Sequence, residues 1–159
     1  MKLYIVVSDT HGDLSGLRKV ISRYSEAQGI IHLGDYLKDA LSIKNEFPEY
    51  EHIMVPGNCD YAMNTPNELV LNIEGKKLFL THGHHYNVKN GTSRLEMKAL
   101  DGGYDAVLFG HTHIPLYKLA SSVHIINPGS LTYPRGFSGP TYALLEVSGA
   151  DIQARIMDL

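Results

Sequence analysis

The sequence has little cysteine, no long apolar run and no run of like charge. Cys59 is the only cysteine among 159 residues, which excludes an internal disulfide framework and suits a reducing compartment. The 14 lysines and arginines never run longer than a pair, so no basic stripe indicates a nucleic-acid polymer as partner. No apolar run approaches the roughly 18 residues that cross a bilayer, and LYIVV at residues 3–7 is too short for a signal-peptide core. We therefore expect a cytoplasmic protein with no membrane partner.

The remaining composition is that of an ordinary globular protein. Hydrophobic residues make up 43% of the chain and charged residues 19%, with a net charge of -3, so a real core can be buried. We find no linker, repeat or low-complexity tract, and we expect one domain over residues 1–159.

The first half alternates apolar β-branched runs with segments of helical periodicity. Apolar runs cover residues 2–7, 29–33 and 52–55, and amphipathic segments lie between them, the first over residues 14–24 and the second ending at Pro48. This β-α-β-α-β pattern predicts a parallel sheet with covering helices.

The second half follows a different pattern. Residues 67–83 predict two strands around a turn at Glu74–Gly75, and a short helix follows from about Ser93 to Leu100. Residues 104–109 predict another buried strand, and the tail from Pro115 predicts antiparallel strands. The fold class is therefore a mixed α/β body with two sheets.

Five apolar runs end in glycine-flanked residues that can bind metal. In chain order these groups are Asp9 and His11; Asp35; Asn58, Cys59 and Asp60; His82, His84 and His85; and His111 and His113. In open α/β sheets, sites gather at the carboxyl ends of the strands. We therefore expect these five ends to converge.

Each of these residues taken alone has a simpler interpretation. A lone aspartate after a strand is more often a turn or helix cap, and a lone histidine is more often structural. We assign His32, His52 and His124 to that structural class, and Met54, Met63 and Met97 to the core. Five coincidences at five strand ends nevertheless favour a metal site.

The predicted ligands are seven side chains with oxygen or imidazole donors: Asp9, His11, Asp35, Asn58, His82, His111 and His113. One tetrahedral zinc ion needs only four, and structural zinc sites favour thiolates. Seven ligands without sulfur suit two ions of the manganese, iron, nickel or zinc kind, with a carboxylate shared between them. Two such ions acidify a bound water to hydroxide and suit displacement at phosphorus.

The order Asp-x-His, Gly-Asp, Gly-Asn, His, Gly-His-x-His resembles the calcineurin-like metallophosphoesterase superfamily over essentially the whole chain. Residues 57–60 (GNCD), 81–84 (THGH) and 127–135 (NPGSLTYPR) resemble its small bacterial and archaeal phosphodiesterase-type members. The resemblance implies a four-layer αββα sandwich of two mixed sheets, with the metal site at the carboxyl ends of the strands.

The resemblance also implies an activity and a ligand set. Phosphodiesters would be hydrolysed by a bridging hydroxide between two divalent ions, most simply manganese, with nickel, iron and zinc as alternatives. The first ion would be held by Asp9, His11, Asp35 and His113, and the second by Asp35, Asn58, His82 and His111, with Asp35 bridging. The substrate would be a small phosphoester, and a homo-oligomer stays open because small members often associate.

One position departs from the family pattern. Many members have histidine where this chain has Cys59, and that histidine is proposed to protonate the leaving oxygen. A thiol is a weak donor that cannot present a cationic hydrogen bond. We expect Asp60 to orient Asn58, and we keep His84 as a candidate replacement acid and Arg135 as a candidate phosphate contact.

Two alternatives to a phosphodiesterase remain from the sequence. The first is a phosphomonoesterase with the same centre. The second is a non-catalytic scaffold, since the fold also resembles a eukaryotic retromer subunit that serves as a binding surface. All seven ligand residues are present, which favours an enzyme.

Overall fold

The computed structural model describes residues 1–61 and 64–159. This part of the chain forms ten strands, three α-helices and two short 3₁₀ helices. The helices are α1 (Ser15–Arg23), α2 (Leu37–Glu46), η1 (His84–Tyr86), η2 (Val88–Asn90) and α3 (Ser93–Gly102). The strands are β1 (Lys2–Val7), β2 (Gly29–His32), β3 (Glu51–Met54), β4 (Glu68–Ile73), β5 (Lys76–Thr81), β6 (Ala106–Leu108), β7 (Leu116–Ala120), β8 (Val123–Asn127), β9 (Thr141–Val147) and β10 (Ile152–Asp158). None of these helices combines the length and the apolar character needed to cross a bilayer.

The strands form two mixed five-stranded sheets, in the orders β10-β9-β1-β2-β3 and β4-β5-β6-β8-β7. In the first sheet β1, β2 and β3 run parallel, and β9 pairs antiparallel with β1 and β10. The predicted β-α-β-α-β start and its parallel pairing are confirmed. In the second sheet β8 pairs parallel with β6 and antiparallel with β7. The expectation of an antiparallel tail is therefore only partly right, because β8 lies between β6 and β7 and pairs with β6 in parallel.

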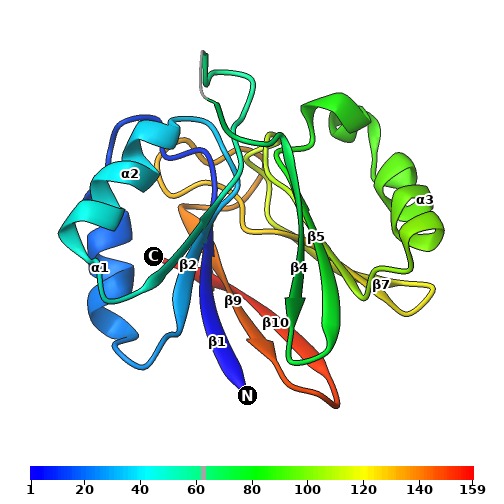
Figure 1. Ribbon diagram of the computed structural model, residues 1–159. Helices are drawn as coiled ribbons and strands as arrows, with labels where there is room; N and C mark the ends of the chain where they lie inside the picture. The colour runs from blue at the N-terminus through cyan, green and yellow to red at the C-terminus, as the bar shows by residue number, and fades with distance from the viewer. Residues whose placement is uncertain (62–63) are drawn as a thin grey trace.

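The two sheets face each other and helices cover their outer sides. Figure 1 shows α1 and α2 outside the first sheet and α3 outside the second. Alternate residues of a strand point to opposite faces. Accordingly Tyr4 and Val6 of β1 join the apolar cluster between the sheets, whereas Ile5 and Val7 pack in a second cluster with Leu17 of α1. A third cluster joins α3 to the second sheet. The αββα sandwich implied by the sequence is confirmed.

The predicted turns lie where the sequence indicated. Glu74 and Gly75 between β4 and β5 have φ values of 52° and 80°, which suit a two-residue turn between antiparallel strands. The helix predicted from Ser93 continues to Gly102, and Gly103 with φ 61° follows it, as glycine does at helix ends. The helices η1 and η2 were not predicted, because single helical turns have no apolar periodicity.

The prediction for the methionines holds only in part. Met97 is 65% exposed, so its assignment to the core is wrong. Helix α3 buries Leu95 and Ala99, and a residue two positions from each of them lies on another face of the helix. Met54 is half-buried, and Met63 lies outside the described residues.

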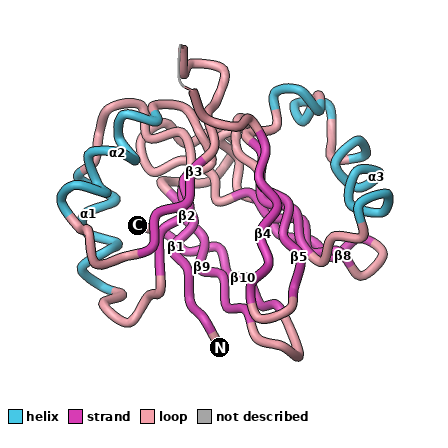
Figure 2. Tube along the Cα trace, viewed as in Figure 1, coloured by secondary structure: helices cyan, strands magenta, loops and turns pink. Residues whose placement is uncertain are grey.

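The strands that precede the predicted ligands end at one rim of the molecule. β1, β2 and β3 are parallel neighbours in the first sheet, and β5 and β6 are parallel neighbours in the second. Figure 2 shows the loops that follow these strands crowded together at the top of the view, above both sheets. The fold therefore brings distant segments of the chain to one place.

Candidate metal centre

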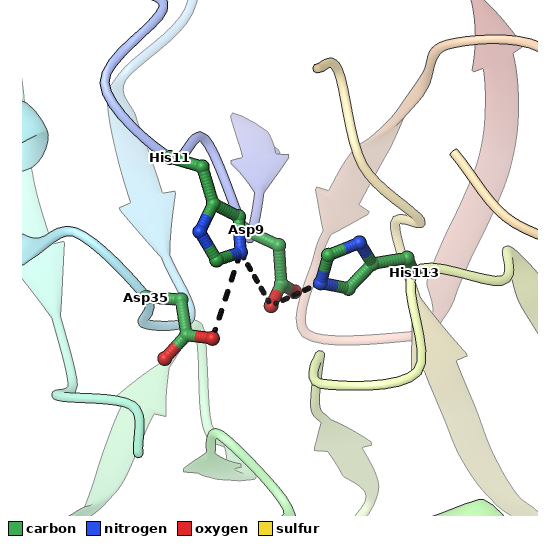
Figure 3. Close-up of side chains that lie close together, drawn as sticks. All are labelled: Asp9, His11, Asp35 and His113. Carbon is green, nitrogen blue, oxygen red and sulfur yellow. Dashed lines mark ion pairs between the residues drawn. The ribbon is translucent and has the colours of Figure 1, made fainter. Parts of the chain in front are cut away.

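Four predicted ligands gather where the two sheets meet at this rim. Ligand atoms of Asp9, His11, Asp35 and His113 all lie within 4.8 Å of one another. Asp9 Oδ1 lies 3.1 Å from His113 Nε2 and 3.9 Å from His11 Nε2, while Asp35 Oδ2 lies 3.6 Å from His11 Nε2. Figure 3 shows both carboxylates turned toward the two imidazoles. This first group has the composition predicted for the first ion.

The other predicted ligands form a second group around His82. His82 Nε2 lies 3.1 Å from Asn58 Oδ1, 3.2 Å from His111 Nδ1 and 3.5 Å from Asp35 Oδ1. Asp35 thus turns Oδ2 toward His11 and Oδ1 toward His82. One carboxylate therefore lies between the two groups.

Two atoms of the first group lack the hydrogen bonds that burial usually requires. Asp9 Oδ1 and His11 Nε2 are buried, and neither has a hydrogen-bond partner among the described residues. A buried polar atom without a partner costs free energy, and a bound cation would supply the missing interaction. Oxygen and imidazole donors without thiolate suit a first-row divalent ion. The residues present therefore fit the metal that the sequence implies.

Backbone carbonyls orient two of the imidazoles. His82 Nδ1 lies 2.7 Å from the carbonyl oxygen of Leu33, and His113 Nδ1 lies 2.7 Å from that of Tyr133. Since a carbonyl only accepts, each Nδ1–H donates, so the neutral form of each ring has its lone pair on Nε2, the atom that would face a cation.

The electrostatics of the group keep Asp9 charged and His111 neutral. Burial would raise the pKa of Asp9, but the contact with His113 and the charge of His82 outweigh it and lower that pKa. Burial, followed by the neighbouring His82 and Lys89, lowers the pKa of His111 to about 4. Carboxylate and neutral imidazole are the forms that bind a metal ion.

The backbone is strained at five predicted ligands. Their φ values are 55° for Asp9, 47° for His11, 55° for Asp35, 69° for His111 and 59° for His113. Residues other than glycine adopt this left-handed region at a cost of about 1 kcal/mol or more each. Such strain gathers at functional sites, and here it coincides with the turns that bring these side chains together.

Glycines of the motifs leave room for the carboxylates. A Cβ on Gly57 would lie 2.1 Å from Asp35 Oδ1, and one on Gly110 would lie 2.0 Å from Ser8 Oγ and 2.9 Å from Asp9 Oδ2. Any larger residue would displace the acidic side chains. The close approach explains why glycine precedes Asn58 and His111.

A buried network that the sequence analysis missed supports the loop between Asp9 and His11. Asp39 Oδ2 accepts hydrogen bonds from Thr10 Oγ1 at 2.5 Å and from the backbone N–H of Gly12 at 2.8 Å, and His32 Nε2 lies 3.0 Å from Thr10 Oγ1. Asp39 is 7% exposed. A carboxylate on the apolar face of an amphipathic helix was the available signal. His32 is structural as predicted, yet it contacts the site through Thr10.

The NPGS segment supports the loop that carries His111 and His113. Asn127 Nδ2 donates to the carbonyl oxygen of Gly110 and to Thr112 Oγ1, each at 3.0 Å. Ser130 Oγ donates to the backbone oxygen of Asp9 at 2.9 Å. This segment therefore joins the rims of the two sheets.

The side chain of Asp60 is occupied by backbone contacts. Its Oδ1 accepts from the N–H of Leu37 at 2.7 Å, and its Oδ2 accepts from the N–H of Gly57 at 2.8 Å. These bonds fasten the Gly57–Asn58 turn to the start of α2.

The remaining catalytic candidates lie around the two groups. Cys59 is exposed, and its backbone N–H donates to Asp35 Oδ1 at 2.9 Å. Burial and then the charge of Asp35 raise the pKa of the Cys59 thiol to about 11. The His84 ring centre lies 5.4 Å from that of His82 and 6.1 Å from that of His111. Arg135 is exposed, and its N–H donates to the backbone oxygen of His113 at 3.0 Å.

The histidines assigned to structural roles lie apart from both groups. His52 Nε2 contacts the carbonyl oxygen of Phe47 at 2.8 Å, and His124 stacks on Tyr117 with 5.9 Å between ring centres. The cluster thus contains the predicted ligands and excludes these two histidines.

Comparison with known proteins identifies the family to which this chain is similar. Residues 1–150 match the model of the calcineurin-like phosphoesterase superfamily domain. The phosphodiesterase YfcE of Escherichia coli (strain K12) is 31% identical over 170 residues, covering 92% of this chain and 88% of the relative.

Solved structures have the same fold. A predicted phosphoesterase from Streptococcus pneumoniae TIGR4 matches with a TM-score of 0.80 at 29% identity, covering 98% of this chain and 88% of the other. Wild-type Vps29 of Entamoeba histolytica, complexed with zinc, matches with a TM-score of 0.78 at 20% identity and covers 98% of each chain. At that identity the second likeness concerns the fold alone.

Proposed function

Because this chain belongs to the calcineurin-like phosphoesterase superfamily, we propose that it is a phosphodiesterase that works with two divalent metal ions. The observation that carries the proposal is the position of Asp35, whose two carboxylate oxygens face different groups of nitrogen and oxygen donors. A carboxylate in this position could serve an ion in each of the two groups.

Each ion would have its own set of ligands. Asp9, His11, Asp35 and His113 would hold the first, and Asp35, Asn58, His82 and His111 would hold the second. Ligand sets without thiolate suit manganese, nickel, iron or zinc, and of these we propose manganese. The buried Asp9 Oδ1 and His11 Nε2, which lack hydrogen-bond partners in the described chain, support the first set most directly.

The bound pair of ions would lower the pKa of a shared water, so that hydroxide is available as the nucleophile near neutral pH. Two dications, two carboxylates and one hydroxide leave a charge of about +1, which suits the single charge of a phosphodiester. Asp60 contributes by holding the turn that carries Asn58, through its bonds to Gly57 and Leu37. A bound substrate would be a small phosphoester.

Protonation of the leaving oxygen is the step for which this chain departs from its family. Cys59 occupies the position of the usual histidine, and its raised pKa makes it a poorer donor still. We propose that reactive leaving groups depart without an acid. His84, whose ring lies beside those of His82 and His111, is the candidate that would assist less reactive ones.

A screen on metal-loaded protein tests this function. After reconstitution with Mn²⁺, bis(p-nitrophenyl) phosphate and p-nitrophenyl phosphate are assayed side by side, together with cyclic nucleotides and dinucleotides. Faster turnover of the diester is expected. Faster turnover of the monoester would establish the phosphomonoesterase instead, and no metal-dependent hydrolysis of any ester would favour a scaffold.

Matched variants show whether the hydrolysis comes from this centre or from a contaminating enzyme. Asp9→Asn removes a charge from the first group and is expected to abolish hydrolysis. Asp101→Asn changes an exposed carboxylate and is expected to retain it. The same rate in both variants would contradict the assignment of the activity to this centre.

A further inference from the structure

A cavity adjoins the loop that carries His111 and His113. Its volume is about 380 Å³, and it is lined by residues of the segments 88–92 and 109–116 and by Arg135. Thr112, which lies between the two histidines in the sequence, forms part of its wall. The cavity and the proposed metal centre therefore share the loop that carries His111 and His113.

Most of the cavity wall is apolar. Val88 and Phe109 are buried beneath it, with 5% and 2% of their surface exposed. Pro115 and Leu116 line one side, and Ile114 is 47% exposed. Small-molecule pockets of about 300–1,000 Å³ are commonly lined in this way. The shape and chemistry suit an apolar group of the size of an aromatic ring.

Two cations complete the wall. Lys89 and Arg135 are exposed, and neither forms an ion pair with a carboxylate within residues 1–61 and 64–159. Arg135 is fastened to the backbone of His113 by its own N–H. Positive charge therefore lines part of the cavity.

We propose that this cavity is a specificity pocket, which takes an apolar, aryl-sized group of a phosphoester while Lys89 and Arg135 attract its phosphate. The proposal rests on the proposed phosphodiesterase function and names its substrate class. Monoanions that join an apolar ring to phosphorus fit both parts of the wall. The pocket binds and orients the substrate and adds no chemical step.

Two phosphinates test the pocket without hydrolysis. Dimethylphosphinate and methyl(phenyl)phosphinate carry the same single charge as a diester but have no bond to cleave. Their dissociation constants are measured by calorimetry on the Mn²⁺-loaded protein. The phenyl compound is expected to bind about 10- to 100-fold more tightly, the usual effect of burying a ring. Equal affinities, or binding of neither compound, would overturn the proposal.

Variants locate the binding surface. Ile114→Ser changes an exposed side chain of the cavity and is expected to reduce the phenyl preference several-fold. Leu119→Ser changes a side chain that is 62% exposed on β7 and does not line the cavity, so the preference should persist. An unchanged phenyl preference in Ile114→Ser would contradict the pocket. An equal loss of the phenyl preference in Ile114→Ser and Leu119→Ser would also contradict it.

Lys89 and Arg135 are tested by their effect on the affinity for both phosphinates. Lys89→Gln and Arg135→Gln are expected to weaken both phosphinates by similar factors and to leave their ratio unchanged, because these side chains attract the shared charge. Lys44→Gln, an exposed position on α2, serves as the control. If Lys89→Gln and Arg135→Gln both bind the two phosphinates as tightly as the wild type does, the role given to the cations is refuted.

Hydrolysis of bis(p-nitrophenyl) phosphate by the same preparation distinguishes the two proposals. Hydrolysis without any phenyl preference would overturn the pocket and leave the phosphodiesterase in place. A phenyl preference without hydrolysis of any ester would support the pocket and overturn the enzymatic function.

Discussion

Asp9 and His113 follow strands of different sheets, and Asp9 Oδ1 lies 3.1 Å from His113 Nε2. The contact joins the two halves of the sandwich at the rim where the candidate metal centre lies. Burial opposes the charge of Asp9, yet its pKa is lowered because His113 and His82 face it. The charged carboxylate of Asp9 therefore suits the binding of a cation at this site.

Replacement of the shared carboxylate is expected to affect activity most. Asp35→Asn should lower kcat/KM by more than about 100-fold, the scale of removing a key electrostatic group, because this carboxylate serves both proposed ions. His84→Ala should cost less, since His84 would assist only the departure of the alcohol. The comparison uses initial rates on bis(p-nitrophenyl) phosphate. Small and equal effects would refute the role of Asp35.

A single added methyl group tests the packing around the carboxylates. Gly57→Ala places a Cβ 2.1 Å from Asp35 Oδ1, so this side chain must move and the Mn²⁺ affinity should fall about 10-fold or more. Gly139→Ala is the matched control, because a Cβ there meets nothing within 4 Å. Equal Mn²⁺ affinities in the two variants would show that the close approach has no bearing on metal binding.

The buried Asp39 is predicted to act as a positioning residue for the first group. Asp39→Ala removes the acceptor for Thr10 and Gly12 and should lower the free energy of unfolding by about 1–3 kcal/mol. It should also weaken Mn²⁺ binding, because Thr10 lies between Asp9 and His11. Asp39→Asn keeps an acceptor oxygen and should restore most of both properties.

A double-mutant cycle separates positioning from general destabilisation. Thr10→Val and Asp39→Ala remove the two ends of one hydrogen bond, so their effects on Mn²⁺ affinity should be less than additive. Full additivity would mean that Asp39 acts on the metal group by another route or on stability alone.

The departure at Cys59 predicts a dependence on the leaving group. Cys59→His restores an imidazole with an ordinary pKa near 6.5, beside the carboxylate of Asp60. Turnover should rise for esters of alkyl alcohols, whose alkoxides need a proton, and change little for nitrophenyl esters. Rates are measured over a series of aryl and alkyl leaving groups. The same slope against leaving-group pKa in both proteins would mean that position 59 takes no part in proton transfer.

The sequence was informative about the fold because periodicity and turn residues are local signals. Alternation along β1 sends Tyr4 and Val6 inward and Ile5 and Val7 outward, and glycine ends α3 at a position that can be seen in the sequence. The parallel pairing of β8 with β6 was not visible, because a strand's neighbour depends on the route of the whole chain. Met97 was misplaced because hydrophobicity alone does not fix the helix face.

The candidate site could be anticipated where its residues follow strands, since parallel strands end at a common rim. Asp39 was missed because its partners Thr10 and Gly12 come from another loop. The left-handed φ values at Asp9 and His113 were not anticipated, because residues other than glycine rarely adopt them. The cavity beside Thr112 likewise depends on segments that meet only in the folded chain.

The number of metal ions bound per chain is the most direct test of a centre that holds two ions. Protein stripped with chelator is dialysed to equilibrium against Mn²⁺, and its metal content is measured by elemental analysis beside that of His82→Ala, which removes a proposed ligand of the second ion. About two ions per chain are expected in the wild type and one in the variant. One ion in the wild type, with the same content in His82→Ala, would refute a centre of two ions.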